Sequence, residues 1–199
     1  MPIYILKIAP ALAAAVVLVA SLAGCQSFAD AITGGNSQGG NGQPAAANSA
    51  TVIRVIDGDT IAVQPSDAFP PTNDAGSEHV IRLLGIDTPE MNVMSEEDLE
   101  CGAQNASDQL AALLPAGAAV SIIFDADADR SDRYGRSLAY VQLADGTDAA
   151  LALASTGYAE AWYPQGEPEP ERFAAYAAAE DNAASSNLGS HSMCDSIGR

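Results

Sequence analysis

The segment "HVIRLLGIDTPE" (residues 79–90) combines the pattern of a buried β-strand with charges that packing alone does not require. Its apolar run predicts a strand, and Pro89 ends it because proline has no N–H to donate to a sheet ladder. Arg82 interrupts the run near its start, and Asp87 and Glu90 stand at its exit. A strand that only supports the fold gains little from one cation and two anions, so the segment indicates a site on a rigid element.

The sequence on both sides of this segment predicts short strands with helices between them. "TVIRVIDGDTIAVQ" (51–64) is typical of a hairpin around an Asp-Gly-Asp turn. After Glu90 the spacing of apolar residues predicts a helix that begins at Ser95 and is ended by Pro115 and Gly117. Two strands, 119–127 and 137–147, and a short helix, 148–156, are predicted next. An extended segment, 158–163, and an alanine-rich helix, 168–187, with acidic residues in its first turn, complete the order. This order predicts an α+β fold, a five-stranded OB-fold β-barrel with about three helices.

The N-terminal residues differ in composition from the rest of the chain. Residues 1–24 have one cation, an apolar run and small residues before Cys25, which is the layout of a secretory signal. "LAGC" resembles a bacterial lipobox, so we expect Cys25 to be lipidated; an ordinary signal and an uncleaved membrane anchor are the alternatives. Residues 25–50 are rich in Gly, Asn, Ser and Gln and predict a flexible tether, which leaves 51–199 as the folded domain.

Export bears on the two remaining cysteines, Cys101 and Cys194. In an oxidising compartment a lone pair of cysteines in a small domain usually forms a disulfide. In the chain-entropy treatment, a bridge across so long a loop stabilises by about 4 kcal/mol. Two unrelated thiols or a metal site are the alternatives, and the absence of a Cys or His cluster around Cys101 disfavours zinc. A structural disulfide is the prediction.

The formal charge of −18 limits what the 199-residue chain can bind. An excess of carboxylates favours solubility, and it argues against broad, sequence-independent binding to a polyanion. An anionic substrate would therefore have to be held by a few local arginines or by a metal ion.

Three charged clusters carry the candidate chemistry: "DGDT" (57–60), Arg82 with "DTPE" (87–90), and "DRSDRYGR" (129–136). Taken singly, they are an ordinary hairpin turn, an ordinary turn sequence and a solvated loop. Together they offer hard oxygen ligands, which suit Ca²⁺ or Mg²⁺, and arginine forks, which match phosphate oxygens. A glutamate beside such a site can orient or deprotonate water for attack at phosphorus.

"VIDGDT", "RLLGIDTPE" and "DRYGRSLAY", in this order with a helix between the second and third, resemble the staphylococcal nuclease (thermonuclease) family over roughly residues 51–190. The resemblance implies an OB-fold barrel and Ca²⁺-dependent hydrolysis of DNA and RNA. It makes Asp59, Asp87 and the carbonyl of Thr88 the expected Ca²⁺ ligands, with Asp57 at the edge of the metal.

The same resemblance implies roles for the other charged residues. Arg82 and Arg136 would contact the scissile phosphate, and Glu90 would orient or deprotonate the attacking water. Tyr134 and Tyr163 would face the nucleotide or lie in the core, and Arg133 is the only nearby substitute for the lysines that commonly surround the site in the family. Trp162 is expected to pack, and His79 and His191 to be solvated.

The leading hypothesis is therefore an exported Ca²⁺-dependent nuclease that acts as a monomer on DNA or RNA and is held at a membrane by its N-terminal lipid. The alternatives are a catalytically weak module of this family that binds nucleic acid, and an acidic lipoprotein in which Ca²⁺ is only structural. Arg82 and Arg136 favour the enzyme, because a structural metal site has no use for arginines that contact phosphate.

Overall fold

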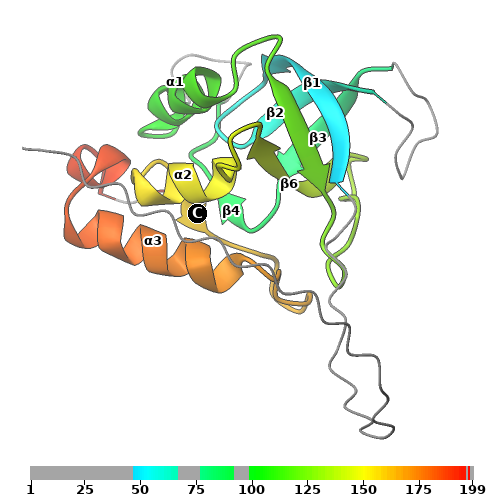
Figure 1. The fold of residues 1–199 in the computed structure, drawn as a ribbon. Coiled ribbons are helices and arrows are strands. Elements are labelled where there is room, and N and C mark those ends of the chain that lie inside the picture. The colour runs from blue at the N-terminus through cyan, green and yellow to red at the C-terminus, as the bar shows by residue number, and fades with distance from the viewer. Residues whose placement is uncertain (1–46, 67–76, 92–98, 196, 198–199) are drawn as a thin grey trace, which may run out of the picture. The chain divides into compact units, whose positions relative to one another are not determined.

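In the computed structural model, residues 47–66, 77–91, 99–195 and 197 are described. Five strands form a closed barrel in the order β1-β2-β3-β6-β5 (Figure 1). Their bounds are Ala47–Val55 (β1), Thr60–Pro65 (β2), His79–Leu83 (β3), Ala119–Ile123 (β5) and Ser137–Leu143 (β6). All pairings are antiparallel except that of β3 with β6. The predicted OB-type barrel is confirmed.

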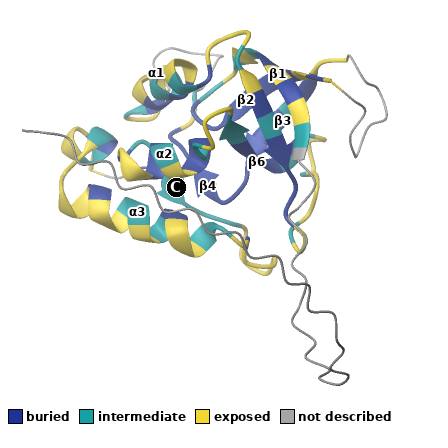
Figure 2. Cartoon of the chain, in the orientation of Figure 1, coloured by how far each residue is buried: buried dark blue, intermediate teal, exposed yellow. Residues whose placement is uncertain are grey.

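Three α-helices and a smaller sheet accompany the barrel in the described residues. The helices are α1 (Ala103–Leu113), α2 (Ala149–Ser155) and α3 (Phe173–Ser185), and a short 3-10 helix, η2 (Gly189–Ser192), follows. The smaller sheet pairs β4 (Ile86–Asp87) with β7 (Glu160–Ala161). Figure 2 shows α3 largely exposed on its outer side, and no helix of the described residues is long and apolar enough to cross a bilayer.

The core fills the barrel and the space under the helices. β2 and β3 are buried along nearly their whole length. Asp148 is the N-cap of α2, and its carboxylate accepts a hydrogen bond from Leu151 N at 3.1 Å. Burial of α2 and of one face of α1 fixes both helices on the barrel.

Side-chain hydrogen bonds fasten the segment before α3 to the barrel. Asp125 accepts bonds from the Tyr140 hydroxyl and from Glu171 N, while Asp148 accepts from Arg172 Nη1 and the Tyr176 hydroxyl, both at 2.7 Å. Burial alone would raise the pKa of Asp125, but these and two further backbone hydrogen bonds outweigh it and lower that pKa. Residues 164–171 are thereby held beside the barrel, where they form one wall of the pocket described below.

Several predicted boundaries were wrong. The single strand 79–87 is two strands, because the chain turns at Gly85, whose φ of +87° is unfavourable for other residues. The helix expected from Ser95 begins at Ala103, since Gly102 has a φ of +87°; Ser95 itself lies outside the described residues. α3 begins at Phe173 rather than at 168, so its first turn contains no acidic residue.

The ends of the strands also differ from expectation. β1 starts at Ala47, inside the segment predicted as tether, because residues 47–51 pair with β5. β5 ends at Ile123 and β6 at Leu143, each about four residues earlier than predicted.

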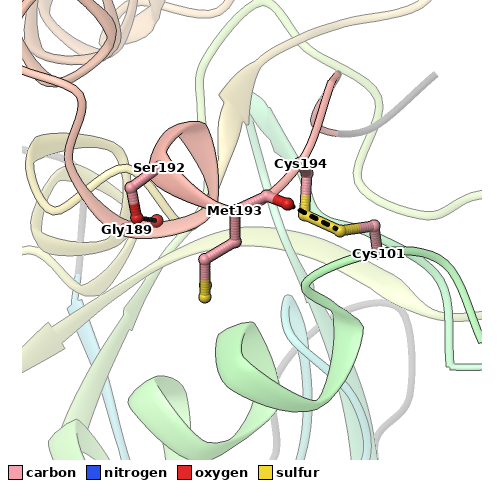
Figure 3. The surroundings of a disulfide bond; sticks show 5 residues. All are labelled: Cys101, Gly189, Ser192, Met193 and Cys194. Carbon is pink, nitrogen blue, oxygen red and sulfur yellow. Dashed lines mark hydrogen bonds between the residues drawn. A yellow bond between two sulfur atoms is a disulfide. The ribbon is translucent and has the colours of Figure 1, made fainter.

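Cys101 and Cys194 form a disulfide that joins the start of α1 to the segment after η2 (Figure 3). Their Cα atoms lie 5.8 Å apart across a sequence separation of 93 residues. η2 is itself fixed to the end of α2 by the hydrogen bond from Ser190 N to Gly157 O, at 2.8 Å. The disulfide therefore ties residues 101–102 to a part of the fold that already rests on α2.

Candidate functional site

Arg82, on β3, is almost completely buried and makes four contacts with the protein. Its Nη1 donates to the carbonyl oxygens of Leu83 and Ile86, at 2.9 and 2.8 Å. Its Nη2 lies 2.9 Å from Asp59 Oδ2 and 2.6 Å from Asp87 Oδ1. The guanidinium group thus occupies one fixed position between two buried carboxylates.

The Asp-Gly-Asp turn approaches the "DTPE" corner so closely that only glycine fits at its centre. A Cβ on Gly58 would lie 2.5 Å from Thr88 Oγ1. Asp59 Oδ2 accepts hydrogen bonds from Thr88 N and Thr88 Oγ1 at 3.1 and 3.2 Å, and Asp57 Oδ1 accepts one from Asp59 N at 3.2 Å. The structure therefore brings together Asp57, Asp59, Asp87 and Thr88, which come from two separate sequence clusters.

Burial and neighbouring charges change the pKa of the Asp59 carboxyl group. Loss of solvent, together with the charges of Asp57 and Asp87, raises its pKa to about 7 against the opposing charge of Arg82 and the hydrogen bond from Thr60. The site thus has more negative charge than its arginine can offset.

Arg136 lies at the start of β6 with its side chain half-buried. Its Nε donates to Asp132 Oδ2 at 2.6 Å, and its Nη1 donates to Thr60 Oγ1 at 3.4 Å. Burial would lower the pKa of Arg136, but the hydrogen bond and charge of Asp132, together with the charges of Asp59 and Asp57, raise it. Thr60 Oγ1 also donates to Asp59 Oδ1 at 3.0 Å, so one hydroxyl connects Arg136 to the buried carboxylate.

Glu90 follows the "DTP" corner and is exposed. Partial burial raises its pKa, and the charges of Asp57, Asp87 and Glu100 act in the same direction against that of Arg82. Its backbone N donates to Glu100 Oε2 at 2.8 Å. A carboxyl group with a raised pKa at a pocket edge suits proton transfer near neutral pH.

A pocket with a volume of about 600 Å³ opens beside Arg82, Glu90 and Arg136, and Asp57, Asp59, Asp87 and Thr88 are not among the residues that line it. All three predicted catalytic residues line it, and so do the three predicted substrate contacts: Arg82, Glu90, Arg136, Arg133, Tyr134 and Tyr163. One wall consists of the proline-rich segment with Pro164, Pro168 and Pro170. Asp59 and Asp87 lie behind Arg82, with which both form ion pairs.

The aromatic residues of the pocket differ in how firmly they are held. Tyr134 is 69% exposed, with the guanidinium of Arg133 4.8 Å from its ring centre and that of Arg136 at 5.7 Å. Tyr163 packs edge-on against Phe173, with ring centres 4.7 Å apart, and also lines the pocket. Trp162, which we expected only to pack, lines the pocket as well. Tyr163 is half-buried and is not part of the buried core, so the alternative of a core position for it was wrong, and contact with a nucleotide stays a prediction.

The structure adds residues that the sequence analysis missed. Asp132 orients Arg136, and its position four residues earlier in a charged loop was the available signal. Glu100 and the proline-rich wall had no such signal, because neither shares a local pattern with the site.

The expectation that His79 is solvated was wrong, since it is buried on β3. Cys25 lies outside the described residues.

The carboxylates of the site are chemically suited to a hard divalent cation. Their ligating atoms are all oxygen, and four carboxylates (Asp57, Asp59, Asp87 and Glu90) face two arginines, which leaves an excess of negative charge. In the part of the chain that the structure describes, however, no three His, Cys, Asp or Glu side chains already converge as a metal site. The guanidinium of Arg82 instead bridges Asp59 and Asp87. The donor chemistry fits Ca²⁺, and the carboxylates are at present paired with arginine.

Comparison with known proteins matches residues 80–190 to the family described as "Staphylococcal nuclease homologue". A curated protein named "Thermonuclease" from Staphylococcus hyicus is 37% identical over 92 residues, which make up 46% of this chain. The match spans 47% of that relative, so the chain covers about half of its length. The matched family region contains Arg82, Glu90 and Arg136 and both strands that bring the arginines together.

Proposed function

The chain belongs to the staphylococcal nuclease family, and we propose on this basis that it is a Ca²⁺-dependent nuclease that hydrolyses phosphodiester bonds of DNA or RNA. The observation that carries the proposal is that Arg82, Arg136 and Glu90 line the same pocket. Hydrolysis at phosphorus needs cations for the phosphate oxygens and a group that handles the proton of water, and the pocket offers both.

The two arginines would bind the phosphate from different sides. Arg136 is held through Nε by Asp132, which sets the plane of its guanidinium group before any substrate arrives. Arg82 is fixed by two carbonyls and two carboxylates, so its position depends little on solvent. Because the Nη groups of Arg82 already donate to these four acceptors, Arg82 would contribute mainly its positive charge. The oriented guanidinium of Arg136 would donate to the phosphate oxygens without reorganising during the reaction.

Glu90 would take the proton of the attacking water. It is exposed at the pocket edge, where water can reach it, and its raised pKa makes the carboxylate a better proton acceptor than an ordinary glutamate. Tyr134 and Tyr163 would contact the nucleotide by stacking against a base or sugar.

Ca²⁺ would be held by Asp59, Asp87 and the carbonyl of Thr88, with Asp57 reached through water. When bound, the ion would neutralise negative charge at the scissile phosphate. The carboxylates also explain how so acidic a chain could accept a polyanion, since bound Ca²⁺ and the two arginines would make this one region attractive to phosphate.

The first test is cleavage of plasmid DNA and of RNA by the full-length chain in mild detergent, with Ca²⁺ in excess and then with EDTA. We expect cleavage with Ca²⁺ and loss of at least about 100-fold with EDTA, since removing the charge at phosphorus removes several kcal/mol of stabilisation. Binding of nucleic acid without cleavage in Ca²⁺ would instead favour the non-catalytic module. Equal activity in EDTA would contradict the metal dependence.

We also propose that the protein is exported and held at a membrane surface by a lipid on Cys25, after removal of residues 1–24. Support comes from the "LAGC" motif and from the polar segment that follows it. We expect Cys25→Ser to move the protein from the membrane fraction to the soluble fraction, because one or two acyl chains supply the membrane affinity. A variant that is cleaved at the signal yet stays with the membrane would contradict lipidation.

A further inference from the structure

Two hydrogen bonds in opposite directions join Glu90 to Glu100. Glu90 N donates to Glu100 Oε2 at 2.8 Å, and Glu100 N donates to Glu90 O at 3.3 Å. The side-chain bond is charge-assisted, which makes it stronger than a bond between neutral groups. Together the two bonds fix the peptide groups on both sides of the Glu90 Cα.

The disulfide in turn restrains Glu100 and the two residues that follow it. Glu100 is followed by Cys101, which is bonded to Cys194 (Figure 3). Ala103 N donates to Glu100 O at 3.0 Å. A Cβ on Gly102 would lie 2.6 Å from Ser190 Oγ, so this turn rests directly against η2. The path from η2 through the disulfide and Glu100 ends at the backbone of Glu90.

We propose that Glu100, held in place by the Cys101–Cys194 disulfide, is a positioning residue that sets Glu90 at the edge of the pocket. The inference rests on the proposed function, because Glu90 matters only if water is activated there. Both glutamates are exposed, and a single exposed hydrogen bond holds its partners only weakly. The covalent restraint on the neighbouring residue limits the conformations of Glu100, so less entropy is lost when the bond forms.

Loss of Glu100 should therefore change the rate of the chemical step and leave the binding of substrate unchanged. Arg82 and Arg136 have no contact with Glu100 among their hydrogen bonds and ion pairs, so loss of Glu100 leaves their positions unchanged. A base displaced by about 1 Å can cost about 100-fold in rate. Loss of Glu100 therefore lowers kcat and leaves KM nearly unchanged.

The test compares three variants of the full-length chain in Ca²⁺. We expect Glu100→Ala to lower kcat by about 10- to 100-fold with KM within about threefold of wild type. Glu100→Gln keeps an oxygen that accepts from Glu90 N, so we expect it to restore most of kcat. Glu78→Ala is the matched control: its carboxylate is exposed and pairs with Arg54 away from the pocket, and its kcat should match wild type.

Reduction of the disulfide tests the second half of the inference. Reduced wild type, shown by near-ultraviolet circular dichroism to be folded at the assay temperature, should lose kcat to a similar extent as Glu100→Ala. Reduction should add little further loss in Glu100→Ala, because both changes release the same restraint and their effects are then not additive. Full additivity, or a reduced protein with unchanged kcat, would overturn the role of the disulfide.

Hydrogen exchange at the Glu90 amide gives a measurement that does not depend on activity. We expect protection of this amide in wild type and Glu100→Gln and faster exchange in Glu100→Ala and in the reduced protein. Unchanged protection in Glu100→Ala, or unchanged kcat in that variant, overturns the inference while leaving the nuclease proposal intact. A wild type that fails to cleave any nucleic acid overturns the nuclease proposal and, with it, the catalytic consequence drawn for Glu100.

Discussion

We expect Arg136→Ala to lower kcat for phosphodiester cleavage by about 1000-fold, because it removes a preorganised donor to the phosphate. The guanidinium lines the pocket, and its bond to Asp132 at 2.6 Å holds it in place without substrate. The loss of stability should be small, about 1 kcal/mol or less, since the side chain is half-exposed and such ion pairs contribute little. Steady-state kinetics on DNA and RNA with Ca²⁺, and urea unfolding, measure the two effects separately.

Two further variants sharpen this prediction. Arg136→Lys keeps the charge but loses the planar fork, so it should recover only part of the activity. Arg130→Ala is the matched control, because Arg130 is an exposed arginine of the same loop, stacks on Phe124 and does not line the pocket. Arg136→Ala activity within threefold of wild type would show that Arg136 does not act on the transition state.

The second large effect is on stability. Arg82→Met should lower the free energy of unfolding by about 3–5 kcal/mol, because it leaves Asp59 and Asp87 buried without the cation between them. The carbonyl oxygens of Leu83 and Ile86 also lose their donor. Urea or thermal unfolding at neutral pH measures the loss. Arg54→Met is the control, because its ion pair with Glu78 is exposed to solvent and its loss should leave the free energy of unfolding nearly unchanged.

The effect of Arg82→Met should depend on pH. The charge of Arg82 lowers the pKa of Asp59, so its removal raises that pKa above the value of about 7. A carboxyl group whose pKa is higher in the folded state than in the unfolded state favours folding at low pH, and this contribution is lost as the pH rises through the folded-state pKa. The gap between variant and wild type should therefore widen from about pH 6 to about pH 8, because Asp59 ionises over this range in the folded wild type but stays protonated in the folded variant. A gap that is constant or shrinks over this range would argue against the charge-based explanation.

The barrel was predictable because its strands carry their own signals. The hairpin around "DGDT" and the apolar run of β3 are local patterns, and turn residues separate them. The break at Gly85 was not predictable, because the apolar residues continue through it and only the positive φ reveals the turn. The start of α1 was missed for a related reason: helical spacing extends to Ser95, but the turn at Gly102, beside the disulfide, sets the boundary.

The residue types of the candidate site were predictable, and their mutual geometry was not. Charged motifs pointed to Arg82, Arg136 and Glu90, all of which line one pocket. That Arg82 would bridge Asp59 and Asp87 depends on contacts between separate elements that no local pattern encodes. The contact of Glu100 with the site was not predictable for the same reason, since Glu100 belongs to a segment whose periodicity indicated only a helix.

The parallel pairing of β3 with β6 has a consequence for how the protein acquires its site. Ile81 pairs with Ser137, and this contact sets Arg82 beside the segment that carries Arg136. Contacts between residues so distant in sequence form only after a long loop has closed, at an entropic cost that local contacts do not share. The two arginines thus come together in the same folding event that completes the barrel, and the first hairpin, β1 with β2, contributes none of the residues that line the pocket.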